Sequence, residues 1–136
     1  MDNLEWKCVS PLKVGTEVET AESKYHFRLP NDLRECLTEH NAGVPSLTAL
    51  DFGGNKGMAF GGLLSFNESD MDNFYDYVAL FERKDGKGLK MIPFALDPAG
   101  NFFCVENGKI VFYNHETDDT ETICDTFKEF LNKLYG

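Results

Sequence analysis

The stretch Ile92–Leu134 reads IPFALDPAGNFFCVENGKIVFYNHETDDTETICDTFKEFLNKL, and its pattern of strands and turns is the strongest indication of the fold. A short apolar strand runs into the turn Asp97–Asn101, and a second strand follows that turn. The dipeptide Asn107-Gly108, a strong hairpin signal, leads to a third strand, Ile110–Tyr113. After an acidic loop, apolar residues return at helical spacing, with Asp125 as the expected helix cap. The stretch therefore predicts a β-meander that is closed by one amphipathic helix.

Two helices are predicted in the N-terminal third of the chain. Apolar residues spaced by three and four positions predict the first helix over Val14–Tyr25. A second helix is expected to start at Pro30 or Asn31. It is expected to end at Asn41-Ala42-Gly43, where Gly43 suits a left-handed cap.

The middle of the chain predicts two strands and one inserted helix. The strands are expected over Leu47–Phe52 and Met58–Phe66, and Gly61-Gly62 in the second indicates a bulge or a close backbone approach. The inserted helix is indicated by apolar residues from position 74 to 81, with Ser69 or Asp70 as its cap.

This order of elements predicts an α+β fold. We expect a largely antiparallel twisted sheet, flanked by the N-terminal helices, the inserted helix and the C-terminal helix. A chain of 136 residues is typical of a single domain, here residues 1–136 with a core of about 11–135. A chain of this length buries enough surface to fold without disulfides.

The net charge of −10 restricts the possible partners. Direct binding to nucleic acid is not expected, because phosphate contacts require a basic surface. A basic protein suits such a surface, although the charge could also serve solubility alone. The sequence shows no signal peptide and no apolar run of membrane-spanning length, so we expect a cytoplasmic protein without a membrane partner, acting as a monomer or a weak dimer.

The four cysteines do not form a metal-binding or catalytic pattern. Cys8, Cys36, Cys104 and Cys124 contain no CxxC pair, and no histidine stands at zinc-ligand spacing from any of them. Cys36 and Cys104 fall at apolar positions and are interpreted as small core residues. We therefore expect neither a bound metal nor a cofactor.

Polar residues gather at two turns of the meander. Asp97, Gly100 and Asn101 are interpreted as structural turn residues, because an aspartate at this position can accept backbone N–H groups and glycine can supply a positive φ. His115 is interpreted as a structural residue at a strand end. The alternative is a metal site or an acid–base pair that uses these residues together with Glu116. Neighbouring residues on a strand point to opposite faces, which disfavours a working pair of His115 and Glu116.

An acidic segment before the inserted helix is the candidate binding surface. Carboxylates interleaved with an aromatic residue suit an interface anchor with a charged rim. The alternative is a solvated helix start, where acids favour the positive end of the helix dipole. The predicted partner-binding residues are Glu68, Asp70, Asp72, Tyr75 and Asp76.

The ordered series of elements resembles the SUKH superfamily, typified by the Smi/Knr cell-wall regulators of yeast. The resemblance covers about residues 11–136. It is carried by the two N-terminal helices, by the strand FGGLLSF, by IPFALDPAGN, by VFYNHE and by TFKEFL. The sequence departs from the family pattern at Asn114, where an aspartate is frequent, and at Ala42, where a glycine is frequent.

The resemblance implies a function in protein binding. Bacterial members look like immunity proteins, which bind and neutralise toxin domains, often nucleases, that pass between competing cells. It therefore implies an immunity protein without a reaction of its own. The alternative is a regulatory or housekeeping interaction module of the same fold with a non-toxin partner. The sequence does not name the partner.

Overall fold

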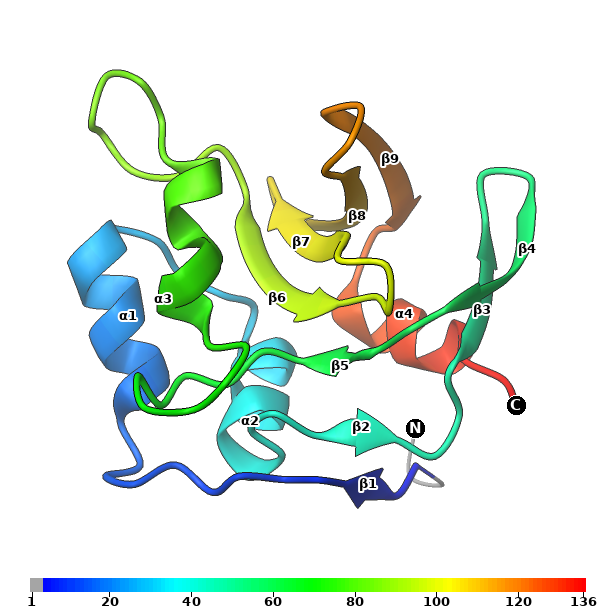
Figure 1. Cartoon of the computed structure of the whole chain (residues 1–136), viewed down its shortest axis with the longest axis horizontal. Helices are drawn as coiled ribbons and strands as arrows, with labels where there is room; N and C mark the ends of the chain where they lie inside the picture. The colour runs from blue at the N-terminus through cyan, green and yellow to red at the C-terminus, as the bar shows by residue number, and fades with distance from the viewer. Residues whose placement is uncertain (1–3) are drawn as a thin grey trace.

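A computed structural model describes residues 4–136 and shows an α+β fold, as predicted. Its centre is a five-stranded antiparallel sheet in the order β5-β6-β7-β8-β9. The sheet curves around helix α4, and the other helices lie to one side (Figure 1). The strands are β5 Gly62–Leu63, β6 Ile92–Leu96, β7 Phe102–Glu106, β8 Lys109–Asn114 and β9 Asp119–Cys124. The helical segments are α1 Glu17–Tyr25, α2 Asn31–Glu39, α3 Phe74–Tyr77, the 3-10 turn η1 Val78–Phe81 and α4 Phe127–Lys133.

The predicted meander is confirmed by strands β6 to β8. The β7–β8 turn uses Asn107 and Gly108, which both have a positive φ, of 51° and 81°. Two successive positive φ values match the twist of the flanking strands, so the pair fixes the hairpin register. Phe103 consequently lies opposite Phe112, and Glu106 lies opposite Lys109.

The acidic segment after the meander was expected to be a loop, and this expectation was wrong. It contains a strand, β9, from Asp119 to Cys124. β9 pairs with β8 along its whole length. Asp119 lies opposite Asn114 at one end, Cys124 lies opposite Ile110 at the other, and the register shifts once next to Ile110. Its outer positions carry acids and threonines, which are typical of an edge strand because charge discourages pairing with another chain. Acidic content therefore marked an exposed sheet edge in this segment.

Two helix starts differ from the expectation. α1 begins at Glu17, and Val14 lies outside it with 79% of its surface exposed. The Glu17 carboxylate accepts hydrogen bonds from the backbone N–H groups of Val14 and Gly15, both at 2.8 Å. α4 is capped by Thr126 in place of Asp125, and the Thr126 side chain accepts from the backbone N–H of Glu129 at 3.1 Å.

The end of α2 also differs in detail. Ala42, and not Gly43, adopts the left-handed conformation, with φ of 64°. Gly43 is required for space instead, because a Cβ there would lie 2.7 Å from the carbonyl oxygen of His40 and 3.1 Å from the Trp6 ring. The glycine thus allows the N-terminal segment to pack against the end of α2.

The strand predicted over Met58–Phe66 is split in two. β4, Asn55–Ala59, pairs with β3, Ala49–Phe52, in a projecting hairpin, whereas β5 joins the main sheet (Figure 1). The break falls at Gly61, where a Cβ would lie 2.8 Å from the carbonyl oxygen of Leu96. The close backbone approach expected at these glycines is therefore present. A short ribbon of β1, Trp6–Lys7, and β2, Val44–Pro45, closes the lower edge in this view.

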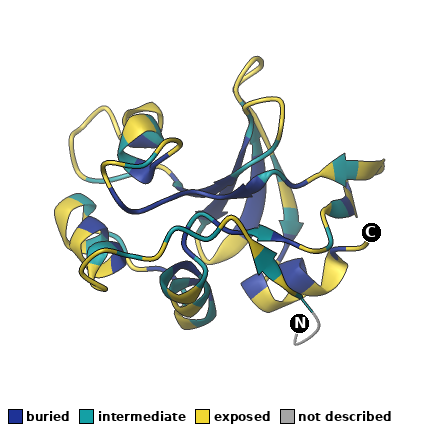
Figure 2. Cartoon of the chain, turned by 60° about the horizontal axis from the view of Figure 1, so that its bottom comes forward, coloured by how far each residue is buried: buried dark blue, intermediate teal, exposed yellow. Residues whose placement is uncertain are grey.

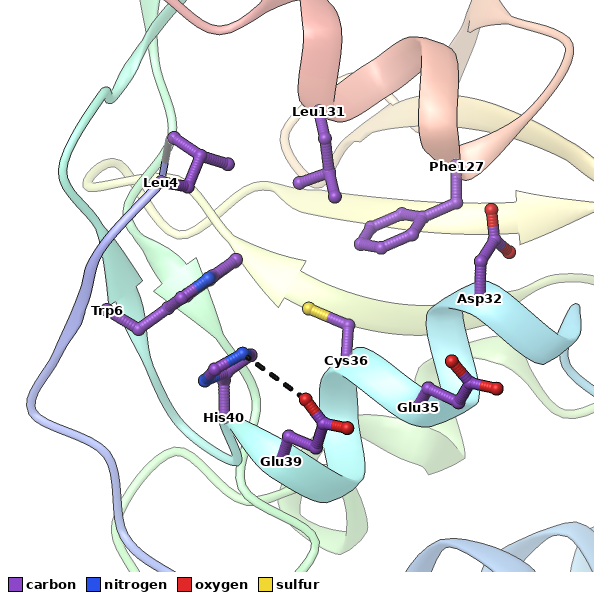
Figure 3. Close-up of a pocket in the computed structure, with 9 residues that line it drawn as sticks. All are labelled: Leu4, Trp6, Asp32, Glu35, Cys36, Glu39, His40, Phe127 and Leu131. Atoms are coloured by element: carbon purple, nitrogen blue, oxygen red, sulfur yellow. Dashed lines mark ion pairs between the residues drawn. The ribbon is translucent and has the colours of Figure 1, made fainter. Parts of the chain in front are cut away.

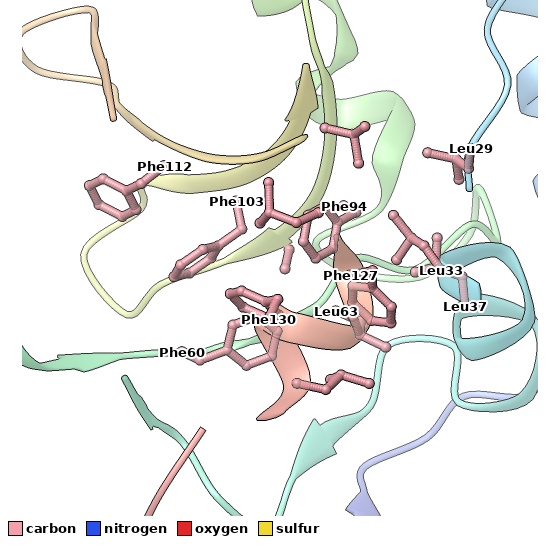
Figure 4. Close-up of a cluster of buried hydrophobic side chains, with 14 of the residues drawn as sticks. Leu29, Leu33, Leu37, Phe60, Leu63, Phe94, Phe103, Phe112, Phe127 and Phe130 are labelled. Atoms are coloured by element: carbon pink, nitrogen blue, oxygen red, sulfur yellow. The ribbon is translucent and has the colours of Figure 1, made fainter. Parts of the chain in front are cut away.

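The central strands of the sheet, β6 and β7, are buried along most of their length (Figure 2). Along β7, Phe103 and Val105 join the main core, whereas Phe102 and Cys104 join a smaller cluster with Phe81 on the opposite face. This two-sided burial explains the continuous apolar run in β7, since alternation is expected only where one face meets water. The main core contains the α4 aromatics, which meet those of the sheet, and the leucines of α2 (Figure 4).

Candidate functional site

The predicted binding residues lie in the loop between β5 and α3 and in the first turn of α3, next to one end of α1 (Figure 1). The chain leaves the core at Asn67, which is buried, and exposes Glu68 and Ser69. Met71 is 89% exposed, and Asp72 has a φ of 52°. The chain then re-enters the core at Asn73 and Phe74. The loop therefore presents its tip between two buried ends, and we call this loop together with the first turn of α3, residues 68–76, the acidic loop.

A buried polar network fixes the base of the acidic loop. The Ser65 hydroxyl donates to Oδ2 of Asp70 at 2.6 Å and accepts from the side-chain amide of Asn41 at 3.0 Å. Asn41 also donates to the carbonyl oxygen of Ser10 and accepts from the backbone N–H of Phe66. Asn41 and Ser65 are both 0% exposed. The network therefore joins three distant segments of the chain beneath the loop.

Two further asparagines hold the sides of the loop. The Asn67 side chain donates to the carbonyl oxygen of Pro11 and accepts from the backbone N–H of Lys13. Asn73 caps α3, where Ser69 or Asp70 was expected, by accepting from the backbone N–H of Asp76 at 3.0 Å. Its amide donates to the carbonyl oxygens of Glu68 and Asp70. Side chains thus satisfy the backbone of the loop, which makes it a fixed surface.

Asp70 therefore differs from its acidic neighbours. Its Oδ2 accepts from Ser65, from the Ser10 hydroxyl at 2.8 Å and from the Asn67 amide at 3.1 Å. These hydrogen bonds favour the charged form, so the pKa of the Asp70 carboxyl lies below its ordinary value. Asp70 is placed to hold the loop together. The acids that are available for contact with a partner are the exposed Glu68, Asp72 and Asp76.

We expect Asp70→Asn to lower the free energy of unfolding by about 1 kcal/mol at pH 7, because three hydrogen bonds lose a charged acceptor. Because folding lowers the pKa of the Asp70 carboxyl, its charge stabilises the folded state fully at pH values above the unfolded-state pKa, which is about 3.9 for aspartate. That contribution disappears as the pH falls through the folded-state pKa. The difference in stability between wild type and variant should therefore shrink as the pH falls below the unfolded pKa. Urea titrations between pH 2.5 and 7 measure the difference.

Asp119→Asn, at an exposed position of β9, is the matched control for this measurement. It should change the stability by less than about 0.5 kcal/mol at every pH. A gap between wild type and Asp70→Asn that stays constant from pH 2.5 to 7 would contradict the assigned role of the Asp70 charge.

Two hollows flank the acidic loop. A groove of about 520 Å³ is lined by Met71, Asp72 and Tyr77 on one side and by Asp97 and Gly100 on the other. The Tyr77 hydroxyl donates to Asp72 at 2.7 Å, which raises the pKa of Tyr77 to about 12. The groove brings part of the acidic loop next to the Asp97 turn. Sequence reasoning treated these as separate features, because the chain gives no local signal of their proximity.

The second hollow has a volume of about 380 Å³ and lies on the other side of the loop. Glu68 and Tyr75 line it together with Val14, which is 79% exposed. The Tyr75 ring packs edge-on against buried Phe74, with ring centroids 5.5 Å apart. This contact leaves Tyr75 half-buried, with one side in the hollow. The predicted residues Glu68 and Tyr75 thus share one concave surface with an exposed apolar side chain.

The Asp97 turn and His115 lie together. Asp97 accepts from the backbone N–H groups of Ala99 and Asn101 at 2.9 and 2.7 Å and from the Asn101 amide at 3.0 Å. Asn101 accepts from the backbone N–H of His115 at 3.1 Å, and Gly100 has a φ of 86°. Both Asp97 oxygens are therefore engaged within the turn.

The described residues around this turn form no cluster of metal-ligand side chains. Across residues 4–136, no three histidine, cysteine, aspartate or glutamate side chains are clustered as a metal site would require. The backbone N–H of Glu116 donates to the Asn114 side chain at 2.9 Å. Asn114 therefore makes a turn contact of the kind that an aspartate there could make.

Sequence reasoning missed a third hollow, about 310 Å³ in volume, between the N-terminal segment, α2 and α4 (Figure 3). We call it the α2–α4 pocket. Trp6 enters it from β1 and stacks on His40, with ring centroids 5.0 Å apart and planes 10° apart. Cys36 lies centrally among the lining residues in this view. The sequence offered one signal for this pocket, the spacing of three and four residues between the α2 acids Asp32, Glu35 and Glu39. Their proximity to Trp6 could not be predicted, because it arises only from the fold.

The fold and the site define a small α+β domain with an exposed acidic loop, and comparison with known sequences gives the family. Residues 15–133 match the SMI1 / KNR4 family (SUKH-1). The match spans most of the chain, and the protein therefore belongs to this family, in agreement with the resemblance seen in its motifs.

Comparisons with curated proteins and with solved structures returned no match. Within the part of the chain that the structure describes, no helix has both the length and the apolar composition needed to cross a bilayer.

Proposed function

We propose that this protein is an immunity protein that binds a basic toxin domain through its acidic loop and thereby neutralises it. The observation that carries the proposal is that Glu68, Met71, Asp72 and Asp76 are all exposed on one segment that a buried network holds in place. Membership in the SUKH-1 family and the net charge of −10 support it.

The composition of this surface suits a protein interface. Interfaces combine apolar anchors with a polar rim, and exposed Met71 and half-buried Tyr75 would supply such anchors on the same segment as the exposed carboxylates. Methionine adapts its shape readily, which suits a contact with an irregular partner surface. The carboxylates would attract a basic partner from a distance and speed its association.

The fixed loop adds to the affinity by lowering the entropy cost of binding. A flexible loop would lose conformational freedom on contact, whereas a loop held by Asn41, Asn67 and Asn73 has already lost it. A nuclease toxin fits particularly well, since a phosphate-binding groove is basic and a row of carboxylates can occupy it. In this proposal the protein catalyses no reaction and acts in the cytoplasm as a monomer or weak dimer.

The first test is capture of partners from the native cells with the tagged protein, at low and then at high salt. We expect a basic protein with a toxin domain that is released by salt, since exposed charge pairs are screened. Capture of a non-toxin partner alone would overturn the immunity function and favour a regulatory module.

With a purified partner, Glu68→Lys/Asp72→Lys should weaken binding roughly thirtyfold. Each reversal of a rim charge costs about 1 kcal/mol, and 2 kcal/mol corresponds to that ratio. The matched control is Glu116→Lys/Asp119→Lys, which changes the net charge equally at other exposed positions. Calorimetry on both double variants measures the effect. Equal weakening by both would mean that only net charge matters and that the acidic loop is not the contact surface.

A further inference from the structure

The α2–α4 pocket has apolar walls formed by distant parts of the chain. Phe127 and Leu131 come from α4, and Leu4 and Trp6 come from the N-terminal segment (Figure 3). Trp6 is held by pairing with Pro45 and by its stack on His40. The aromatic walls are therefore fixed in place, with Trp6 remaining half-buried.

The helix α2 gives the same pocket a row of carboxylates. Asp32, Glu35 and Glu39 line it, and their spacing of three and four residues places them on one side of the helix. No lysine or arginine is among the lining residues. Arg34 on the same helix forms an ion pair with Glu22 at 3.0 Å, so it is engaged elsewhere.

The negative potential of these acids reaches the middle of the pocket. Burial, and then the charges of Glu39 and Asp32, raise the pKa of the Cys36 thiol to about 12. The thiol is therefore neutral at physiological pH and contributes an apolar surface to the pocket. His40 is the one histidine lining the pocket, and its Nε2 lies 3.8 Å from Glu39 Oε2.

We propose that the α2–α4 pocket binds an arginine side chain of the protein partner. The methylene stem would pack against Leu4 and Trp6, which are only half-buried, and the guanidinium would reach the carboxylates of α2. Arginine fits this pocket better than lysine, because the planar guanidinium stacks on aromatic rings and is more weakly hydrated than an ammonium group. This inference rests on the proposed function only in that the arginine belongs to a protein partner.

The other hollows lack this combination. The hollow beside α1 includes Lys13, and a fourth hollow beside Pro30 and Asn107 includes Arg28 but no acid. The groove beside the Asp97 turn has no aromatic wall other than Tyr77. Among the hollows described, the α2–α4 pocket alone pairs several aromatic and apolar walls with three carboxylates and no basic side chain.

The chain contains its own reporter for this site, since Trp6 is its only tryptophan. The probe is Nα-acetyl-L-arginine amide, titrated into the whole protein while the emission of Trp6 is recorded. We expect saturable binding with a Kd of about 1 mM, as suits so small a ligand. The neutral isostere Nα-acetyl-L-citrulline amide should bind at least tenfold more weakly. Equal binding of both amides, or no saturable change with the arginine amide, would overturn the proposal.

Two variants separate this site from the acidic loop. Glu35→Gln/Glu39→Gln should weaken the arginine amide at least tenfold and leave the fold intact, because both side chains are exposed. The control Glu68→Gln/Asp72→Asn removes the same charge from the acidic loop and should leave amide binding unchanged. A loss of amide binding in the control, or none in the Glu35/Glu39 variant, would contradict the assignment. Failure of the immunity function would not alter these results, so the two proposals are tested separately.

Discussion

Replacing Asn41 with alanine is expected to lower the free energy of unfolding by about 3 kcal/mol. The Asn41 side chain makes hydrogen bonds of 2.8 to 3.0 Å to the backbone of Ser10, the hydroxyl of Ser65 and the backbone N–H of Phe66. Alanine would leave the Ser10 carbonyl and the Phe66 N–H without this partner in a region where Asn41 is 0% exposed, whereas the Ser65 hydroxyl would keep its hydrogen bond to Asp70. Each unsatisfied buried group costs about 1–3 kcal/mol, and local rearrangement recovers part of the total.

Urea unfolding at neutral pH measures this loss, and Asn132→Ala is the control. Asn132 is exposed in α4, and its replacement should cost less than about 0.5 kcal/mol. Because Asn41 supports the base of the acidic loop, Asn41→Ala should also weaken partner binding while the variant is still folded. A loss of stability below 1 kcal/mol would show that the network is not a principal support of this region.

The network also shows why the role of Asp70 could not be predicted from the sequence. Its position between exposed acids indicated a surface charge, and the neighbouring residues give no sign of its contacts. The Ser10 hydroxyl that donates to Asp70 is 60 residues away along the chain. A contact of this kind depends on tertiary packing, which residue spacing does not encode. Glu68, Asp72 and Asp76 make fewer such contacts, so for them the simple interpretation as exposed acids agrees with the structure.

Local signals succeeded where the local backbone decides the structure. The Asn107-Gly108 turn and the glycine at position 100 set the meander, because positive φ values are required there whatever packs nearby. β9 could not be predicted in the same way. Its acids and threonines fit a loop and an edge strand equally well, and pairing with β8 decides between them.

The α2–α4 pocket illustrates the same limit for a site. Cys36 was interpreted as a core residue from its apolar position, and it does pack against the main core. The pocket above it exists only because Gly43 lets Trp6 lie close to the end of α2. An aromatic residue six positions into the sequence carries no indication of that neighbour.

Phe130→Ala is expected to cost about 3–5 kcal/mol, the largest loss among these predictions. The Phe130 side chain is 0% exposed, and its ring centroid lies 5.4 to 5.9 Å from those of Phe60, Phe94 and Phe103. These contacts join α4 to the sheet, as Figure 4 shows. Truncation would remove the packing on several sides at once and leave a cavity, because the surrounding rings belong to different elements and cannot all move inward.

Guanidinium unfolding followed by far-ultraviolet circular dichroism measures this loss, and Phe130→Leu and Leu80→Ala complete the comparison. Phe130→Leu keeps most of the apolar volume and should cost clearly less than the alanine variant. Leu80→Ala removes an apolar side chain that is 55% exposed and should cost no more than about 0.5 kcal/mol. If Phe130→Ala lost no more than Leu80→Ala, α4 would not be a principal support of the sheet. We expect the loss of stability to decrease from Phe130→Ala to Phe130→Leu to Leu80→Ala. This order would show that the aromatic contacts of α4 support the main core, which lies on the side of the sheet away from Phe81 and Phe102.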